Sequence, residues 1–281
     1  MSPRQRLPAY AQLIVVSAPD VRELFDGPLV VLGRIMPASN HTFLTQLGDT
    51  GVQCVYKPQS GERPLWDFTD GTLAAREYAA WLVSEHLGWN IVPPTVLRDG
   101  PAGPGMVQLW MEAEEPTEAA SERPDPVDVV PEGSMPSGFL HVVDASGPGD
   151  EPVMLVHEDS VPLRRMAVFD LITNNTDRKG GHVLPMSDGH RYGVDHGVCF
   201  HSEDKLRTVL WGWAGQSLAP EELAGVESVL AGLDGDLRDP LEDLLTVREV
   251  EAVARRCERL LRVRKFPMPR GGWPSIPWPP F

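Results

Sequence analysis

The order of predicted strands and one helix in the first 112 residues constrains the fold more than any other feature of the sequence. Three short β-like runs, "LVVLGRI", "HTFLTQL" and "VQCVYKP", are separated by the turn-like breaks "MPASN" and "GDTG". An amphipathic helix is predicted over residues 70–88, with Gly88 as its stop signal. Two more strands follow in "PPTVLRDG" and "GMVQLWME". The predicted order is therefore β-β-β-α-β-β.

The charge and cysteine content of the chain exclude several classes of function. A net charge of −15 over 281 residues disfavours binding to nucleic-acid phosphates or to anionic lipid surfaces. The three cysteines are scattered, without a CxxC or Cys/His cluster, which argues against a zinc site or a disulfide framework. No apolar run is long enough to cross a bilayer, and "LIVV" is too short for a signal-peptide core. A cytoplasmic protein without a transmembrane segment is expected.

The rest of the chain divides into three predicted parts. Residues 113–137 form an acidic, proline-rich stretch that predicts a loop or disordered insertion. Residues 138–266 begin with a strand hairpin and end in helices, which predicts a mostly helical second lobe after an N-lobe over residues 1–112. The tail over residues 267–281 is too rich in proline for regular structure, and its Trp273 and Trp278 are expected to pack back onto the body.

The stretch "NNTDRKGGHVL", which begins at Asn174, places many polar groups directly after the predicted helix "PLRRMAVFDLIT". It is either an exposed turn or a catalytic loop. Asp177 is followed five positions later by His182, and the "DHG" tripeptide begins at Asp195. Earlier in the chain, Lys57 ends a predicted strand and Glu77 lies on the helix that follows. Each feature alone is weak, but their order is uncommon.

This order matches the needs of phosphoryl transfer from ATP. That chemistry needs a lysine on the phosphates, a carboxylate to hold it, an acidic group near the attacking hydroxyl and two metal ligands. Protein kinases place a metal-binding asparagine five residues after the catalytic aspartate and a second metal ligand in a D-x-G turn. Lys57, braced by Glu77, would then hold the α- and β-phosphates of ATP, and Asp177 would orient or deprotonate the acceptor. His182 and Asp195 would be the metal ligands, within a catalytic loop over 174–182 and a turn over 195–197.

Three stretches carry a resemblance to a known family: "AAREYAAWLVSEHLGWNIVPPTVL", "FDLITNNTDRKGGHVL" and "YGVDHGVCF". The sequence resembles the phosphatidylinositol 3- and 4-kinase-like branch of the protein-kinase-like superfamily, in particular an uncharacterised actinobacterial family closest to type II phosphatidylinositol 4-kinases. In such kinases the catalytic loop reads N-x-D-R-x-x-x-N. The resemblance covers roughly residues 29–215. It implies an α+β, two-lobed protein-kinase-like fold, with an antiparallel-sheet N-lobe and a mostly helical C-lobe, that uses ATP with Mg²⁺ or Mn²⁺.

The sequence departs from the kinase pattern at two points. The loop "MPASNHTF" holds no glycine, so Ser39, Asn40 and Thr42 either donate to phosphate oxygens or form an ordinary hairpin turn. His182 stands where asparagine is expected, and an imidazole favours transition metals over Mg²⁺. His182 is therefore either a metal ligand or a surface histidine, and loss of that ligand would make the chain a pseudokinase.

Two further sets of groups complete the predicted site. The main chain of Trp110, Met111 and Glu112, at the hinge between the lobes, is expected to hydrogen-bond the adenine. Arg178 is counted with Asp177 and Lys57 in the catalytic set, where it supports the loop through hydrogen bonds together with Asp170. Asp170 could equally be a half-buried polar group whose hydrogen bonds are satisfied.

The predicted function is transfer of the γ-phosphoryl group of ATP to a hydroxyl of a protein, an inositol-type lipid or a small metabolite. The alternatives are an ATP-binding pseudokinase that regulates a partner and a nucleotidyl transferase that moves AMP. A protein partner is possible, because the basic run "RRCERLLRVRKF" near the C-terminus is the one strong positive patch of the sequence. It either binds an anionic partner or is a solvated helix face.

Overall fold

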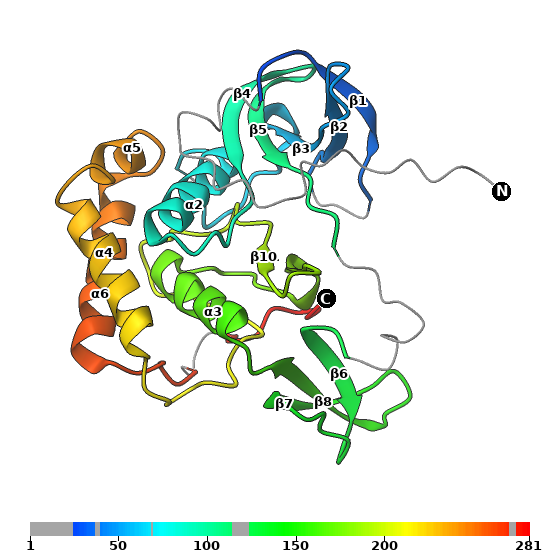
Figure 1. The fold of residues 1–281 in the computed structure, drawn as a ribbon, viewed down its shortest axis with the longest axis vertical. Coiled ribbons are helices and arrows are strands. Elements are labelled where there is room, and N and C mark those ends of the chain that lie inside the picture. Colours follow the sequence, from blue (N-terminus) through cyan, green and yellow to red (C-terminus); the bar gives the residue numbers. More distant parts are fainter. Residues whose placement is uncertain (1–24, 37–39, 69, 114–123, 270–273) are drawn as a thin grey trace.

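The computed structural model describes residues 25–36, 40–68, 70–113, 124–269 and 274–281. Within these residues the N-lobe is a five-stranded antiparallel sheet in the order β1-β2-β3-β5-β4, seen at the top of Figure 1. Its strands run as follows: β1 Leu29–Arg34, β2 Phe43–Leu47, β3 Gln53–Pro58, β4 Thr95–Gly100 and β5 Gly103–Leu109. All five strands predicted from the sequence are present.

Helix α2, Leu73–Leu87, lies between β3 and β4 in the chain and packs against β4 and β5. The side chain of Thr72 caps its first turn by accepting a hydrogen bond from the N–H of Ala75, and Gly88 ends it in the left-handed conformation, with φ of 65°. The prediction of a helix over 70–88 that stops at Gly88 is confirmed.

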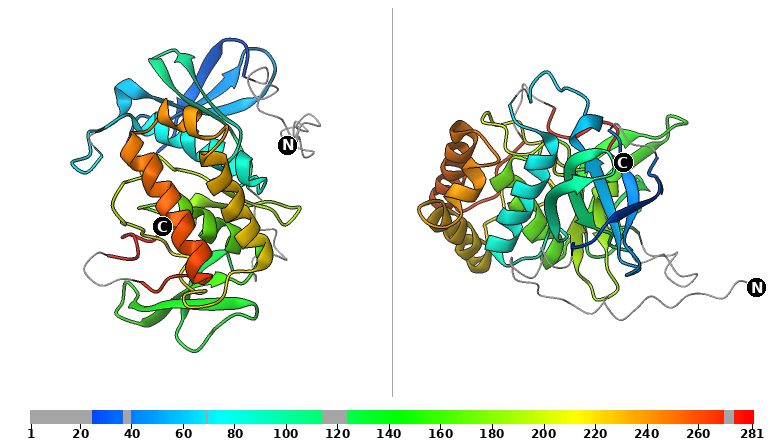
Figure 2. Two further views of the ribbon diagram at one scale, coloured as in Figure 1. Left: turned by 90° about the vertical axis from the view of Figure 1, so that its left-hand side faces the viewer. Right: turned by 90° about the horizontal axis from the view of Figure 1, so that it is seen from above.

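The C-lobe is mainly helical. Its helices are α3 Val161–Thr173, α4 Pro220–Leu233, α5 Arg238–Glu242 and α6 Val247–Val263. Helices α4 and α6 pack side by side on the flank of the molecule, next to α2, as Figure 2 shows. A buried ion pair between Arg76 of α2 and Glu249 of α6, 2.7 Å long, joins the two lobes at this flank. Burial of both partners makes the pair costly to break.

A short hairpin in the C-lobe follows the polar loop after α3. The 3-10 turn η3, Gly180–His182, leads into β9, Val183–Pro185, which pairs with β10, Arg191–Gly193. This hairpin brings the loop after α3 and the "DHG" turn to the same place, because the chain turns back at residues 186–190.

A second sheet of three strands lies at the far end of the C-lobe, at the bottom of Figure 1. Its central strand β8, Pro152–Glu158, pairs with β7, Phe139–Ser146, in the predicted hairpin. On its other side β8 pairs with β6, Val127–Pro131. The expectation of a loop is therefore wrong for residues 127–131.

The reason is local to the segment "VDVV". Val127 reaches the main core, while Val130 packs with Met154 and Val156 in a small separate cluster. The average composition of the stretch is acidic and rich in proline, which hides these apolar residues. Their pairing partner is β8, a strand more than 20 residues later, so the local sequence does not reveal it. Residues 114–123 of the predicted insertion lie outside the described residues.

The tail over residues 274–281 has no regular structure, as its proline content predicts. However, Trp278 does not pack onto the body, because it is 77% exposed, and Trp273 lies outside the described residues. Ile276 contacts the core instead. The indole N–H of Trp211 and the main-chain N–H of Thr208 donate to the carbonyl of Ser275 at 2.8 and 3.0 Å. The described part of the tail is thus held by these two hydrogen bonds and by the packing of Ile276.

The described residues therefore adopt an α+β, two-lobed architecture, with an antiparallel N-lobe sheet, one helix and a mostly helical C-lobe, as the sequence predicts. None of the helices among these residues combines the length and the apolar character needed to span a bilayer.

Amide hydrogen exchange tests the unexpected strand. Because β6 and β7 both pair with β8, we expect the hydrogen-bonded amides of the two strands to exchange at similar rates, at least about tenfold slower than in an unfolded peptide. Unprotected amides over residues 127–131, alongside protected β7 amides, would contradict the pairing.

Candidate active site

The polar loop begins where α3 ends. Asn174 closes the helix in the left-handed conformation, with φ of 54°, and its main-chain N–H donates to the carbonyl of Asp170. Its side-chain amide donates to the carbonyls of His201 at 2.9 Å and Glu203 at 2.6 Å. Asparagine adopts this backbone region more readily than most residues, so the sequence itself predicts the sharp exit from the helix.

Arg178 is the centre of the loop and is fully buried together with Asp170. Its Nε and Nη2 donate to the Asp170 carboxylate at 2.9–3.2 Å, and its Nη1 donates to the carbonyls of His182 and Val194. A buried charge requires such pairing. Because no part of Arg178 reaches the surface, its contacts lie within the protein, and it supports the loop through hydrogen bonds together with Asp170.

Asn175 links Asp177 to the buried carboxylate of Asp170. Its side-chain amide donates to Asp170 at 3.1 Å, and its carbonyl oxygen Oδ1 accepts from the main-chain N–H of Asp177 at 2.9 Å. The side chain of Asp177 itself stays 34% exposed. The loop is therefore not an exposed turn: most of its polar groups are used to hold one partly exposed carboxylate.

Lys57 joins the two lobes. Its Nζ lies 2.6 Å from Oε1 of Glu77 and 2.8 Å from Oδ1 of Asp195. Burial disfavours the charged lysine, but the charges of Asp195 and Glu77 outweigh it and raise the pKa of Lys57. The same contact with Lys57 is the largest cause that lowers the pKa of Asp195. Both groups are therefore ionised at neutral pH.

His196, which sequence reasoning missed, links these two networks. Its main-chain N–H donates to Oε2 of Glu77 at 2.8 Å. Its ring Nε2 lies 2.6 Å from Nη2 of Arg178, and since a guanidinium can only donate, this nitrogen must accept. Burial, followed by the charge of Arg178, lowers the pKa of His196 well below its usual range, so the ring is neutral.

The space beside this contact is tight, and Gly193 occupies it. A Cβ atom at Gly193 would lie 3.1 Å from both terminal nitrogens of Arg178 and 3.3 Å from Nε2 of His196. Nothing in a single sequence marks His196 or Gly193, because their role arises from contacts between distant parts of the chain.

His182 and Asp195 face each other, with Nε2 of His182 3.5 Å from Oδ2 of Asp195. Burial lowers the pKa of His182 to about 4, and the nearby charges of Arg178, Lys179 and Lys57 add to that effect against Asp195. A neutral imidazole is the form that ligates metals. The 3.5 Å distance shows that His182 and Asp195, which the sequence predicts as metal ligands, lie together in the structure.

This pair fits a divalent cation that takes further ligands elsewhere. Among the residues that the structure describes, no group of three or more His, Cys, Asp or Glu side chains is arranged to hold a metal ion. Mg²⁺ is commonly bound through one or two carboxylates, with phosphate oxygens and waters completing its shell. The carboxylate of Asp195, 53% exposed, matches that mode, whereas the imidazole of His182 favours a transition metal such as Mn²⁺.

Asp177 lies in an electrostatic setting suited to a proton acceptor. Burial raises the pKa of its carboxyl, and the charge of Asp195 acts in the same direction, while Lys179 and Arg207 oppose them. The Nζ of Lys179 lies 3.6 Å from Oδ2 of Asp177. A carboxylate with a raised pKa accepts a proton more readily than an ordinary aspartate.

The predicted phosphate loop is used largely by the protein itself. The side-chain oxygen of Asn40 accepts from the main-chain N–H of Arg63 at 2.9 Å, and Thr42 is buried with its hydroxyl 3.5 Å from the carbonyl of Asn40. The oxygen of Asn40 is thus used within the protein and Thr42 is buried, while donation to phosphate by the amide N–H groups of Asn40 stays a prediction. Ser39 lies outside the described residues.

The predicted hinge follows β5 in an extended segment without regular structure. The main-chain N–H of Trp110 donates to the carbonyl of Gln53 at 3.0 Å, so it cannot also serve an adenine ring. The expected adenine contacts therefore fall to the carbonyl of Trp110 and to the main chain of Met111 and Glu112.

The tail contacts the predicted catalytic loop directly, which the sequence did not indicate. The main-chain N–H of Gly180 donates to the carbonyl of Pro280 at 2.8 Å. A Cβ atom at Gly180 would meet the ring of Phe281, so a larger residue here would require that ring to move. The tail thus braces the turn that leads to His182.

Comparison with known proteins finds a relative by sequence and several likenesses by structure. Protein Rv2133c of Mycobacterium tuberculosis (strain ATCC 25618 / H37Rv) is 51% identical over 264 residues, which are 92% of this chain and 94% of that protein. No protein-family model matches the sequence.

The structural likenesses include the Golgi casein kinase and the Helicobacter pylori proinflammatory kinase CtkA. The first has a TM-score of 0.49 and 14% identity, and covers 88% of this chain and 74% of its own. The second has a TM-score of 0.46 and 11% identity, and covers 85% of this chain and 93% of its own. These identities are too low to transfer either protein's activity.

Replacing Asp170 tests whether the loop depends on its buried ion pair. Asp170→Asn leaves the Arg178 guanidinium buried without a balancing charge, and we expect a loss of about 3 kcal/mol in the free energy of unfolding. Glu251→Gln makes the same chemical change in the exposed pair with Arg255 and should cost less than about 1 kcal/mol. Equal shifts of the urea midpoint in the two variants would contradict a structural role for the buried pair.

Proposed function

We propose that this chain, which belongs to the family of Protein Rv2133c of Mycobacterium tuberculosis, is an atypical kinase that transfers the γ-phosphoryl group of ATP to a hydroxyl acceptor. The observation that carries the proposal is the position of Lys57, ion-paired with Glu77 of the N-lobe and with Asp195 of the C-lobe. A lysine on strand β3 held by a glutamate of the following helix is the arrangement that kinases use to hold ATP phosphates.

Lys57 would bind the phosphates of ATP. Its Nζ is fixed by Glu77, whose second oxygen is in turn held by the main chain of His196. The lysine therefore has one permanent partner in the N-lobe and one exchangeable partner, the half-exposed Asp195. Phosphate oxygens would share Nζ with Asp195 without loss of the contact to Glu77.

Asp177 would orient the acceptor hydroxyl and take its proton. As the hydroxyl oxygen forms a bond to the γ-phosphorus, the bond from that phosphorus to the β–γ bridging oxygen breaks and ADP leaves with the electron pair. The proton of the hydroxyl passes to the Asp177 carboxylate, whose raised pKa favours this step. The main-chain and side-chain bonds from Asn175 and Arg178 hold the loop in place.

Asp195 and His182 would hold Mg²⁺ or Mn²⁺. When bound, such an ion would offset the negative charge of the ATP phosphates. Both side chains are already in the protonation state that a metal ligand needs. Lys57 keeps Asp195 ionised, and burial keeps His182 neutral.

The acceptor follows less directly from the site. The resemblance to type II phosphatidylinositol 4-kinases supports an inositol-type lipid, whereas the net charge of −15 favours a protein or a small polar metabolite. The three acceptor classes share a hydroxyl nucleophile, so a screen of all three against labelled ATP is needed to choose among them.

A pseudokinase is the second candidate, and histidine at position 182 is the observation that favours it. Incubation with ATP labelled at the γ- or the α-phosphorus separates the possibilities. A kinase labels its acceptor or releases labelled phosphate from γ-labelled ATP alone. Label transferred from the α-phosphorus would indicate AMP transfer, and ATP binding without turnover would indicate a pseudokinase.

Removal of Lys57 should weaken ATP binding. Lys57→Ala deletes a charge-assisted contact to phosphate, and we expect the dissociation constant for ATP with Mn²⁺ to rise at least about tenfold. Lys265→Ala removes an exposed lysine beyond α6 and should leave affinity unchanged. Isothermal titration calorimetry measures both, and equal affinity of Lys57→Ala and wild type would remove Lys57 from the site.

Replacement of the proposed base should stop turnover without unfolding the protein. Asp177→Asn keeps the shape of the side chain and its main-chain bond to Asn175, so the thermal midpoint should stay close to wild type. Phosphotransfer should fall by about 10²- to 10⁴-fold, the usual contribution of a general base. Undiminished phosphotransfer by folded Asp177→Asn would show that the loop has been assigned wrongly.

The metal preference tests His182. Imidazole nitrogen suits Mn²⁺ better than Mg²⁺, whereas an amide oxygen suits both. We expect the wild type to bind ATP more tightly with Mn²⁺ than with Mg²⁺, and His182→Asn to narrow that ratio. An identical Mg²⁺/Mn²⁺ ratio in the two proteins would place His182 outside the metal shell.

A further inference from the structure

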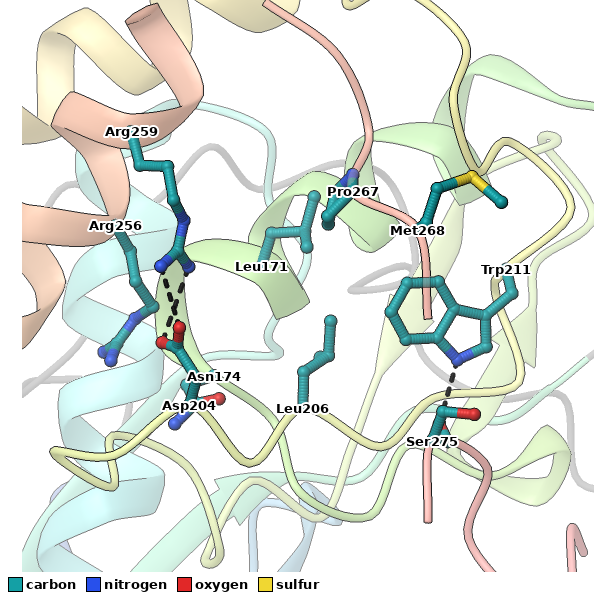
Figure 3. Close-up of a pocket in the computed structure, with 10 residues that line it drawn as sticks. All are labelled: Leu171, Asn174, Asp204, Leu206, Trp211, Arg256, Arg259, Pro267, Met268 and Ser275. Carbon is teal, nitrogen blue, oxygen red and sulfur yellow. Dashed lines mark hydrogen bonds and ion pairs between the residues drawn. The ribbon is translucent and has the colours of Figure 1, made fainter. Parts of the chain in front are cut away.

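A cluster of arginines on α6 lines a hollow that the proposed kinase reaction does not use. Arg255, Arg256 and Arg259 form one wall, and Ser202 and Asp204 lie opposite in the segment after the "DHG" turn. The hollow is open to the surface, with a volume of about 270 Å³. A smaller cavity next to it shares Asp204, Arg256 and Arg259, as Figure 3 shows.

Arg256 forms the floor of this hollow and is only 3% exposed. Its Nε donates to the carbonyl of Ile172 at 2.8 Å, and its Nη1 donates to the carbonyl of His201 at 3.3 Å. Within the part of the chain that the structure describes, its Nη2 has no hydrogen-bond partner. A buried donor without a partner is costly, so this side chain is incomplete without an acceptor.

The charges around the hollow also call for an anion. Three guanidinium groups line it against the single carboxylate of Asp204, which pairs with Arg259 at 2.8 Å. Arg255 pairs with Glu251 at a loose 3.6 Å, largely in solvent. Burial lowers the pKa of Arg256 to about 10, and Arg259 and Arg255 are among the charges that lower it. These arginines repel one another, and an anion between them would remove that repulsion.

The opposite wall is held in shape without a ligand. The carbonyls of His201 and Glu203, on either side of Ser202, both accept from the side-chain amide of Asn174. The hydroxyl of Ser202 is thus carried by a fixed segment. A preformed wall lowers the ordering cost of binding.

We propose that this hollow binds a phosphate group, either as free phosphate or as the monoester of a small molecule. Arg256 and Arg259 would donate to its oxygens, with Arg255 and the Ser202 hydroxyl at the rim. Guanidinium groups match tetrahedral phosphate oxygens through paired N–H donors. The volume is at the lower end for ligand sites, which suits a small monoester. The net charge of −15 makes a nucleic acid or an anionic membrane a poor occupant.

Calorimetric titration at low ionic strength tests the proposal, with inorganic phosphate, glycerol 3-phosphate and uncharged glycerol as probes. Wild type should bind both phosphates saturably and should not bind glycerol. Arg259→Gln and Arg255→Gln, at partly exposed positions, should fold normally, and each should weaken binding, about tenfold for Arg259→Gln. Tighter binding of glycerol 3-phosphate would identify a monoester site, and equal binding would identify a site for free phosphate.

Two control variants distinguish binding in this hollow from binding in the nucleotide cleft and from a general effect of surface charge. Arg248→Gln removes the same charge from an exposed residue near the start of α6 that does not line the hollow, and it should bind phosphate as wild type does. Lys57→Ala should also bind normally, because it alters only the proposed nucleotide cleft. Absence of saturable binding, an equal loss in Arg248→Gln, or a loss confined to Lys57→Ala would each overturn the proposal. Since this readout needs no ATP turnover, it stands apart from the proposed kinase activity.

Discussion

The buried ion pair between Arg178 and Asp170 is the interaction on which the rest of the site depends. Taking both charges out of water is expensive, and only complete pairing and hydrogen bonding make it tolerable. Arg178 meets this condition by donating to Asp170, to the carbonyls of His182 and Val194 and to the ring of His196. One residue therefore fixes the end of α3, the predicted catalytic loop and the "DHG" turn relative to one another.

Lys57 does for the two lobes what Arg178 does within the C-lobe. Its ammonium group lies between Glu77, which is buried, and Asp195, which is half-exposed. The buried pair is fixed further by the main chain of His196, so the lysine cannot leave Glu77 without leaving a carboxylate unpaired in the interior. The contact with Asp195 carries no such penalty, because water can replace it. The contact of Lys57 with Glu77 is therefore stable, whereas its contact with Asp195 can be exchanged for another partner.

Structural features that depend on local sequence pattern were predicted from the sequence, whereas features that depend on contacts between distant residues were not. The strands, α2 with its stop at Gly88, and the proximity of His182 to Asp195 followed from periodicity, turn signals and spacing. Strand β6 did not, because its pairing edge comes from β8, and the bond from the tail to Gly180 did not, because proline-rich segments carry no pairing signal. Full burial of Arg178 also depends on Gly193, a position that no local rule marks.

Asp195 shows how these constraints concentrate at one residue. Its backbone is in the left-handed region, with φ of 62°, a conformation that costs a residue with a Cβ atom about 1 kcal/mol or more. The neighbouring main-chain bond from His196 to Glu77 and the pull of Lys57 on the carboxylate hold it there. The backbone is thereby fixed from inside, while the carboxylate remains half-exposed and faces both Lys57 and His182. A rigid backbone with an ionised, accessible carboxylate suits the binding of a metal–phosphate group. Folding has already fixed the orientation of the carboxylate, so binding does not have to supply that free energy.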